Sequence, residues 1–332
     1  MLNTKTVERI VGQRIMAGFH GTDLNHDLCF LIDTLRVGGI ILFSRNITGR
    51  QQLKTLCMNA AEYARSCGLP PLFIAIDQEG GTVARLKGPD FTEFKGARFI
   101  KNEQDAEAFA RITAEELCGA GINMDMAPVM DVAPPGFDSI MSKRVFGDDP
   151  RWVCKIGCTV IRGLQDRGVM AVAKHFPGIG RTSLDSHMER PDLDASMDSL
   201  EAFDLIPFYA AAAEGVSGIM LSHVRYTGID PVWPASLSPA IAKSLLRNKM
   251  SYKGVVVTDD LEMGAIRNHY DTETVMRQVL DAEIDIALIC KTKEVIIDAF
   301  DAMCRQISDR PVIREKADAS ENRIHALKAR LE

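Results

Sequence analysis

The sequence of 332 residues lacks an apolar run long enough to cross a membrane and lacks any cluster of basic residues. A membrane-spanning helix needs roughly 18 consecutive apolar residues, and none of the runs reaches that length. The 39 Lys and Arg residues are outnumbered by 45 Asp and Glu residues, which gives a net charge of −6. Nucleic acids and anionic membranes are bound by concentrated positive charge. We therefore expect neither as a partner.

Cysteine occurs eight times, but not in the pattern of a disulfide scaffold or a zinc site. The closest pair, Cys154 and Cys158, is separated by three residues, and no histidine pair follows at zinc-finger spacing. The first residues carry Glu8 and Arg14 among apolar neighbours, so they lack the core of a signal peptide. We expect reduced thiols and a cytoplasmic protein.

The chain also lacks a linker, a low-complexity tract and an internal repeat. It contains eight short apolar runs that end in polar residues, at 14–19, 38–44, 72–77, 122–132, 169–176, 218–224, 254–260 and 284–290. Such runs are typical of strands buried on both faces of a parallel sheet. Between them lie helical stretches, at 49–68, 103–121, 148–168 and 271–283. Three of these stretches run into glycines that cap helices, namely Gly68, Gly121 and Gly168.

Eight strands that alternate with helices predict an α/β protein with a (β/α)8 TIM-type barrel, in which residues 1–332 form a single domain. The alternative is a doubly wound sheet, which would place a glycine fingerprint after the first strand. The nearest match is Gly178 and Gly180, which follow the fifth strand and lack the third glycine. The barrel is therefore favoured.

A barrel of this type places its active site at the carboxyl ends of the strands. Polar residues gather at those ends in this sequence: 44–46, 77–79, Asp131, 174–175, 222–223 and 259–260. This regularity predicts a polar active site at that end of the barrel.

The pair Asp259 and Asp260 closes the seventh run. Such a pair can bind a metal, act as acid and base, or cap the next helix. We assign the helix cap to Asp260. Asp259 would then face the mouth of the barrel as a nucleophile or a metal ligand.

The segment KHFPGIGRTSLDSHMERPDLD (174–194) is the most distinctive in the chain. Within it, the Asp185 carboxylate could orient the His187 imidazole for general acid/base work, although a bare Asp-Ser-His tripeptide is more often plain surface loop. We expect Gly178 and Gly180 to act as hinges that let this loop close over a substrate.

A third constellation is Asp77-Gln78-Glu79-Gly80-Gly81, followed by Arg85. A carboxylate and a guanidinium offer acceptors and donors, as sugar hydroxyl groups require. We expect Glu79 to form a structural ion pair. By itself, Arg144 would be a solvated surface residue.

Six motifs give the chain a family resemblance: GGIILFSRN, AIDQEGGTVARL, MAPVMDV, KHFPGIGRTSLDSH, MLSHV and VVVTDDLEM. They occur in this order over about residues 38–263. The sequence thus resembles glycoside hydrolase family 3, and in particular its single-domain β-N-acetylglucosaminidases of peptidoglycan recycling. The resemblance implies hydrolysis of terminal β-linked GlcNAc from muropeptide-type fragments, with no metal and no organic cofactor. We expect a small carbohydrate substrate and a monomer.

The resemblance also implies the role of each site residue. Asp259 is the nucleophile that forms a covalent glycosyl-enzyme, and His187 with Asp185 is the general acid/base. The remaining positions match the sugar pocket of the family: Asp77, Arg85, Arg144, Lys174, His175, His223 and Met263.

One position departs from the family pattern. Relatives usually carry a second histidine in the KHFPG loop where this chain has Ile179. Isoleucine forms no side-chain hydrogen bond, so the departure bears on the leaving-group preference or the rate. Thr258 replaces a common serine, and we expect little effect.

Three alternatives stay open at this point. The first is a phosphorylase or a β-glucosidase on the same scaffold. The second is metal-dependent chemistry from His175, His187, His223 and Asp259. The third is a sugar-binding protein that has kept the barrel without catalysis.

Overall fold

The computed structural model describes residues 4–184, 186 and 189–331. Its centre is a sheet of eight parallel strands in the spatial order β10-β1-β2-β3-β4-β5-β7-β9. A bridge between Val257 and Ile286 joins the two ends of this order and brings the sheet close to a closed barrel. The strands are β1 (Ile15–Gly18), β2 (Gly39–Leu42), β3 (Phe73–Ile76), β4 (Met124–Asp125), β5 (Met170–Phe176), β7 (Gly218–Leu221), β9 (Val255–Thr258) and β10 (Ala287–Ile289). All eight predicted strands and the (β/α)8 class are confirmed.

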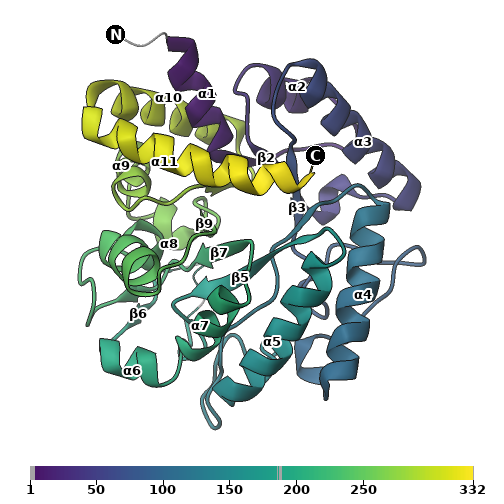
Figure 1. The fold of residues 1–332 in the computed structure, drawn as a ribbon, viewed down its shortest axis with the longest axis vertical. Coiled ribbons are helices and arrows are strands. Elements are labelled where there is room, and N and C mark those ends of the chain that lie inside the picture. Colours follow the sequence, from purple (N-terminus) through teal and green to yellow (C-terminus); the bar gives the residue numbers. More distant parts are fainter. Residues whose placement is uncertain (1–3, 185, 187–188, 332) are drawn as a thin grey trace.

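Helices surround the barrel (Figure 1). The four predicted ones are α3 (Arg50–Ser66), α4 (Glu103–Gly119), α5 (Pro150–Gln165) and α9 (Thr272–Asp281). The others are α1 (Thr4–Gln13), α2 (His26–Asp33), α6 (Met197–Ala202), α7 (Ile206–Ala213), α8 (Gly264–Arg267), α10 (Lys293–Asp309), α11 (Pro311–Lys328) and the π-helix η4 (Ala240–Lys249). Two short strands, β6 (Asp192–Leu193) and β8 (Arg225–Tyr226), pair outside the barrel.

The glycines at the ends of α3, α4 and α5 behave as the sequence predicts. Gly68, Gly121 and Gly168 have φ values of +68°, +81° and +84°. Glycine adopts this left-handed conformation without a Cβ penalty, and it turns the chain from the helix into the next strand.

The interior of the barrel is filled by apolar side chains from alternate strand positions, among them Ile41, Phe73 and Val172. Ile324 and Leu327 of α11 belong to the same cluster. Figure 1 shows α11 in yellow beside α10 and α1, reaching over the strands. The helix therefore closes the amino-terminal end of the barrel and leaves the carboxyl end for the site. In the described part of the chain, no helix combines the length and the apolar character needed to cross a bilayer.

Candidate active site

A cavity of about 150 Å³ lies at the carboxyl ends of the strands, where the sequence places the chemistry. Its apolar wall includes Ile41, Phe43, Met220 and Leu288. Seven of the ten predicted site residues line it: Asp77, Arg85, Arg144, Lys174, His175, Asp259 and Met263. They come from β5 and from the loops that follow β3, β4 and β9, so the barrel gathers residues that are far apart in the sequence.

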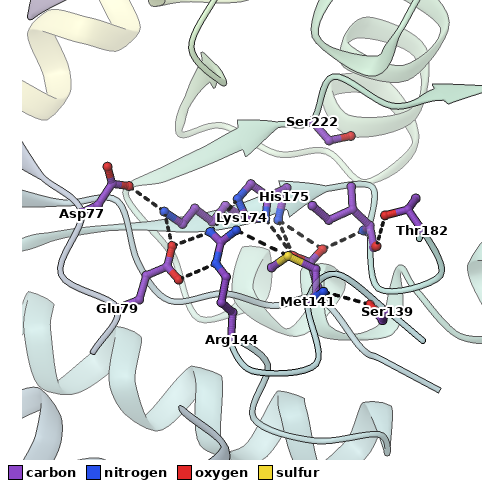
Figure 2. A network of polar contacts seen from close by, with 12 residues as sticks. Asp77, Glu79, Ser139, Met141, Arg144, Lys174, His175, Thr182 and Ser222 are labelled. Atoms are coloured by element: carbon purple, nitrogen blue, oxygen red, sulfur yellow. Dashed lines mark hydrogen bonds and ion pairs between the residues drawn. The ribbon is translucent and has the colours of Figure 1, made fainter. Parts of the chain in front are cut away.

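Lys174 is the centre of a charged network on one side of this cavity (Figure 2). Its ammonium nitrogen lies 2.7 Å from Asp77 Oδ1 and 2.7 Å from Glu79 Oε1. The side chain is only 2% exposed, so burial strengthens both ion pairs. Lys174 thus holds two carboxylates from the β3 loop in fixed positions.

Two arginines extend the network at either end. Arg144 grips Glu79 with two hydrogen bonds, at 2.9 Å from Nε and 2.6 Å from Nη2. Arg85 Nη2 lies 3.2 Å from Asp77 Oδ2. The ion pair expected for Glu79 is present, whereas the surface position expected for Arg144 alone is wrong, because the buried Glu79 carboxylate draws this arginine inward.

The network keeps its carboxylates ionised. Burial by itself raises the pKa of Asp77, but Lys174 and Arg85 outweigh it and lower that pKa to about 2. Burial likewise opposes ionisation of Glu79, yet Lys174 and Arg144 hold its pKa below the ordinary value. These groups therefore act as fixed hydrogen-bond acceptors near neutral pH.

Asp259 follows β9 and borders the cavity. Its Oδ1 accepts a hydrogen bond of 2.8 Å from the Asp260 amide. Burial favours the neutral acid, but His223, His175, the Asp260 amide and Lys174 bring the pKa of Asp259 below its ordinary value. The carboxylate is thus ionised and available at the cavity wall.

The helix cap expected of Asp260 is wrong, because the next helix, α8, begins only at Gly264 after Met263 in the cap position. Instead, Asp260 Oδ1 accepts hydrogen bonds from the amides of Glu262 at 3.1 Å and Cys290 at 3.2 Å. Burial raises the pKa of Asp260 to about 6. This side chain ties the β9 turn to the end of β10.

His223 follows β7 and is 1% exposed. Its Nδ1 lies 2.7 Å from Ser236 Oγ and its Nε2 lies 2.8 Å from the carbonyl oxygen of Asp260. His223 is not among the described residues that line the cavity. These contacts place it beside the Asp259-Asp260 turn, where it contributes to the low pKa of Asp259.

The segment after β5 begins with a tightly packed stretch. Gly178 has φ +128° and lies against Asp204, and a Cβ on Gly180 would come within 1.8 Å of the Val132 carbonyl oxygen. Close packing by itself requires glycine at both positions, and the hinge motion expected from the sequence stays a prediction. Asp185 and His187, the predicted acid/base pair, lie outside the described residues.

Asp131 contacts this stretch, although the sequence marked it only as a strand-end residue without a role. Asp131 Oδ2 lies 2.8 Å from His175 Nδ1.

Within the described ranges, no group of three or more His, Cys, Asp or Glu side chains is arranged to hold a metal ion.

Comparisons with known proteins identify relatives of the chain. Residues 6–327 match the family described as "Glycosyl hydrolase family 3 N terminal domain". The Beta-hexosaminidase of Alkalilimnicola ehrlichii is 34% identical over 291 residues, covering 85% of this chain and 82% of that protein. The Beta-hexosaminidase of Stenotrophomonas maltophilia (strain K279a) is 32% identical over 298 residues, which cover 87% of this chain and 86% of that protein.

Solved structures agree with these sequence matches. A glycoside hydrolase family 3 beta-N-acetylglucosaminidase from Paenibacillus sp. superposes with a TM-score of 0.94 at 36% identity. That match covers 99% of this chain, which spans 63% of the length of the Paenibacillus chain. A Beta-N-acetylhexosaminidase from Beutenbergia cavernae superposes with a TM-score of 0.91 at 27% identity and is covered over 99% of both chains.

Proposed function

Because the chain belongs to glycosyl hydrolase family 3 and is a glycoside hydrolase, we propose that it is a retaining exo-β-N-acetylglucosaminidase. Its substrates are fragments of the muropeptide type, from which it removes terminal β-linked GlcNAc. Residues 1–332 act as one catalytic domain. The names of its relatives, Beta-hexosaminidase and beta-N-acetylglucosaminidase, support this substrate class.

One observation carries the proposal. The ionised carboxylate of Asp259 borders a small cavity, and the other polar groups that line this cavity can form hydrogen bonds with a sugar. The groups around Asp259 hold its pKa below the ordinary value despite burial. A retaining glycosidase needs such a carboxylate to attack the anomeric carbon and to stabilise an oxocarbenium-like transition state. Asp259 therefore takes the role of nucleophile.

The reaction then proceeds in two steps. In the first, the His187 imidazolium, paired with Asp185, gives its proton to the glycosidic oxygen while the bond from that oxygen to the anomeric carbon breaks. Asp259 forms a bond to the same carbon and yields the glycosyl-enzyme. In the second step, neutral His187 takes a proton from water, the water oxygen attacks the anomeric carbon, and the Asp259 carboxylate leaves.

The sugar pocket is formed by the charged network. Asp77 supplies acceptors, and Arg85, Arg144 and Lys174 supply donors, so both polarities of a sugar hydroxyl are matched. The cavity of about 150 Å³ is smaller than the roughly 300–1,000 Å³ that hold drug-sized ligands. A cavity of this size favours one terminal ring and hence exo action.

The remaining parts of the proposal are a cytoplasmic location, a monomeric state, and a role for His223 near the substrate. All eight cysteines are free thiols, which fits a reducing compartment.

The test is turnover of 4-nitrophenyl β-GlcNAc, β-GalNAc and β-glucoside, each with and without phosphate. We expect the highest kcat/KM for β-GlcNAc, no acceleration by phosphate and no loss after treatment with a chelator. NMR of the first product should show the β-anomer. Phosphate-dependent turnover would identify a phosphorylase, and a preference for the glucoside would identify a β-glucosidase. An α-anomer as the first product would exclude Asp259 as a retaining nucleophile.

A further inference from the structure

Asp131 is completely buried and receives three N–H groups from two places in the chain. The ring nitrogen Nδ1 of His175 lies 2.8 Å from Oδ2, and the His175 backbone nitrogen lies 3.3 Å from Oδ1 and from Oδ2. The backbone nitrogen of Ile179 lies 2.8 Å from Oδ1. One carboxylate therefore holds a residue of the sugar pocket and a residue of the loop that leads to the acid/base pair.

The partners of His175 determine where its proton lies. Arg144 Nη2 is 3.3 Å from His175 Nε2, and a guanidinium nitrogen can only donate. Nε2 must therefore be the accepting, unprotonated nitrogen, and Nδ1 carries the proton that is donated to Asp131. This tautomer connects Asp131 through His175 to Arg144, which grips Glu79 (Figure 2 shows the part from His175 onward).

The other contact of Asp131 fixes the start of the loop. Ile179 is 5% exposed, and its carbonyl oxygen accepts a hydrogen bond of 2.7 Å from Thr182 Oγ1. The buried Tyr226 donates from its hydroxyl group to the Gly178 carbonyl oxygen at 2.8 Å. We call residues 178–182 the loop foot, and both Asp131 and Tyr226 hydrogen-bond to its backbone.

We propose that Asp131 is a positioning residue that sets the tautomer of His175 and also holds the loop foot, so that the sugar pocket and the loop foot keep a constant relative position. The kinetic consequences of this inference rest on the proposed function, whereas the tautomer of His175 does not depend on that function. Acid transfer and nucleophilic attack occur on one substrate, and displacement of about 1 Å between such groups can cost 100-fold in rate.

The Asp131→Asn variant separates the two tasks of Asp131, which are to set the tautomer of His175 and to hold the Ile179 amide. If its oxygen keeps the Ile179 amide, its NH2 group replaces Oδ2 and faces His175 Nδ1. That nitrogen must then accept, which moves the ring proton to Nε2 and sets it against the Arg144 donor. Phenylalanine at position 226 does the converse, because it removes a hydrogen bond from the loop foot and leaves His175 untouched.

The direct test is the ¹⁵N spectrum of the histidine rings. Wild-type protein should show His175 protonated at Nδ1 and unprotonated at Nε2, with His175→Gln used to assign the signals. Asp131→Asn should move the proton to Nε2, whereas Tyr226→Phe should not. A wild-type ring protonated at Nε2 would overturn the proposal, and this measurement needs no variant of Asp131 to fold and no turnover.

Kinetics then tests the coupling. Asp131→Asn should raise KM and lower kcat/KM by about 10- to 100-fold, as loss of a group that orients a ligand-binding histidine does. Tyr226→Phe should slow substrates with poor leaving groups about 10-fold more than 4-nitrophenyl substrates, because its effect reaches catalysis through the acid. In the His175→Gln background, Asp131→Asn should add little to KM.

Asp230 supplies the matched control. It is 9% exposed and accepts hydrogen bonds from the amides of Val232 and Trp233 and from Ser238, none of which is among the described residues that line the cavity. Asp230→Asn should lower thermal stability about as much as Asp131→Asn and leave KM and the His175 signals unchanged. Equal KM effects from both variants would reduce Asp131 to a structural role. An expected spectrum without hexosaminidase turnover would instead reject the proposed function and keep the tautomer.

Discussion

The two ends of the barrel both bury charged networks, but the networks differ in what surrounds them. At the amino-terminal end, the Asp285 carboxylate accepts from Ser320 at 2.7 Å, from Arg323 Nε at 2.9 Å and from the Val256 amide at 2.8 Å, and it also pairs with Arg247. This network ties η4 and α11 to β9. At the carboxyl end, the Lys174 network borders a cavity.

This difference indicates that the two networks have different roles. Asp285 has protein partners on both oxygens and is 0% exposed, so its carboxylate is closed to a ligand. The carboxyl-end groups Asp77, Arg85, Arg144 and Lys174 are paired with one another, yet they still line the cavity. Barrel folds separate these tasks, with stability at the amino-terminal end and chemistry at the carboxyl end. Charge substitutions at the two ends should therefore fail in different ways.

The largest effect is expected from Asp259→Asn. Turnover of 4-nitrophenyl β-GlcNAc should fall by at least about 1,000-fold, because an amide cannot form the glycosyl-enzyme. The free energy of unfolding in urea should change little. Addition of azide to Asp259→Gly should restore turnover and release a glycosyl azide of inverted configuration, since the small anion replaces the missing nucleophile. Near wild-type rates in Asp259→Asn would reject the assignment.

Asp285→Asn should be the most damaging change for stability. It leaves Arg247 and Arg323 buried without a counter-charge, and breaking a buried pair in this way costs about 3–5 kcal/mol. Urea unfolding measures the loss, and kcat/KM per folded molecule should stay within about twofold. The exposed pair of Glu115 with Arg111 is the control, and Glu115→Gln should cost less than about 1 kcal/mol. A fall in kcat/KM with intact stability would contradict the division of labour between the two ends.

Glu79→Gln should show an intermediate pattern at the carboxyl end. The amide keeps the shape of the side chain but leaves Lys174 and Arg144 with one acceptor fewer, so both move in the sugar pocket. We expect kcat/KM to fall about 10- to 100-fold, which corresponds to roughly 1.4–2.7 kcal/mol. Steady-state kinetics with 4-nitrophenyl β-GlcNAc gives the value. An unchanged KM would show that Glu79 orients nothing that the substrate touches.

The sequence predicted the barrel well because its physical signals are local. Each strand was an apolar run that ended in polar residues, and α3, α4 and α5 ended at glycines that the left-handed turn requires. Helices α2, α7, α10 and α11 were among those not predicted. They pack mainly against other helices, α2 on α3, α7 on α5 and α10 on α9, and a sequence pattern does not show such contacts. Seven cavity residues were predicted through the family motifs. These motifs lie at or just after the ends of the strands, and the barrel brings those ends together.

The errors came from contacts that only three-dimensional packing creates. Asp260 looked like a helix cap, but its partner amide on Cys290 is 30 residues away. Gly180 looked like a hinge, but the structure gives it a further reason to be glycine, the close approach of the Val132 carbonyl oxygen. Arg144 looked solvated because Glu79 lies 65 residues earlier in the chain. Sequence spacing carries no signal for such pairs, and it was the family resemblance that placed Arg144 at the sugar pocket.

The last expected effect is a difference between the two ends of the barrel in how stability depends on pH. Lys174 and Arg85 overcome burial and lower the pKa of Asp77 to about 2, from an ordinary 3.8. Between these values the unfolded chain binds more protons, so stability falls with pH from about 4 to about 2, by about 2 kcal/mol. Asp77→Asn should lack this loss.

At the amino-terminal end, burial lowers the pKa of Lys328 from 10.5 to about 7, although Gln13 and the Gly38 carbonyl oxygen accept from its ammonium group at 2.8 Å. The unfolded chain again binds more protons between the two values, so stability should rise as pH increases from about 7 to 10.5. Lys328→Met should remove this alkaline change and leave the acid change, whereas Asp77→Asn should do the reverse. Urea unfolding of both variants from pH 2 to 10 tests this expectation. If both variants changed stability over the same pH range, the two networks would not be independent.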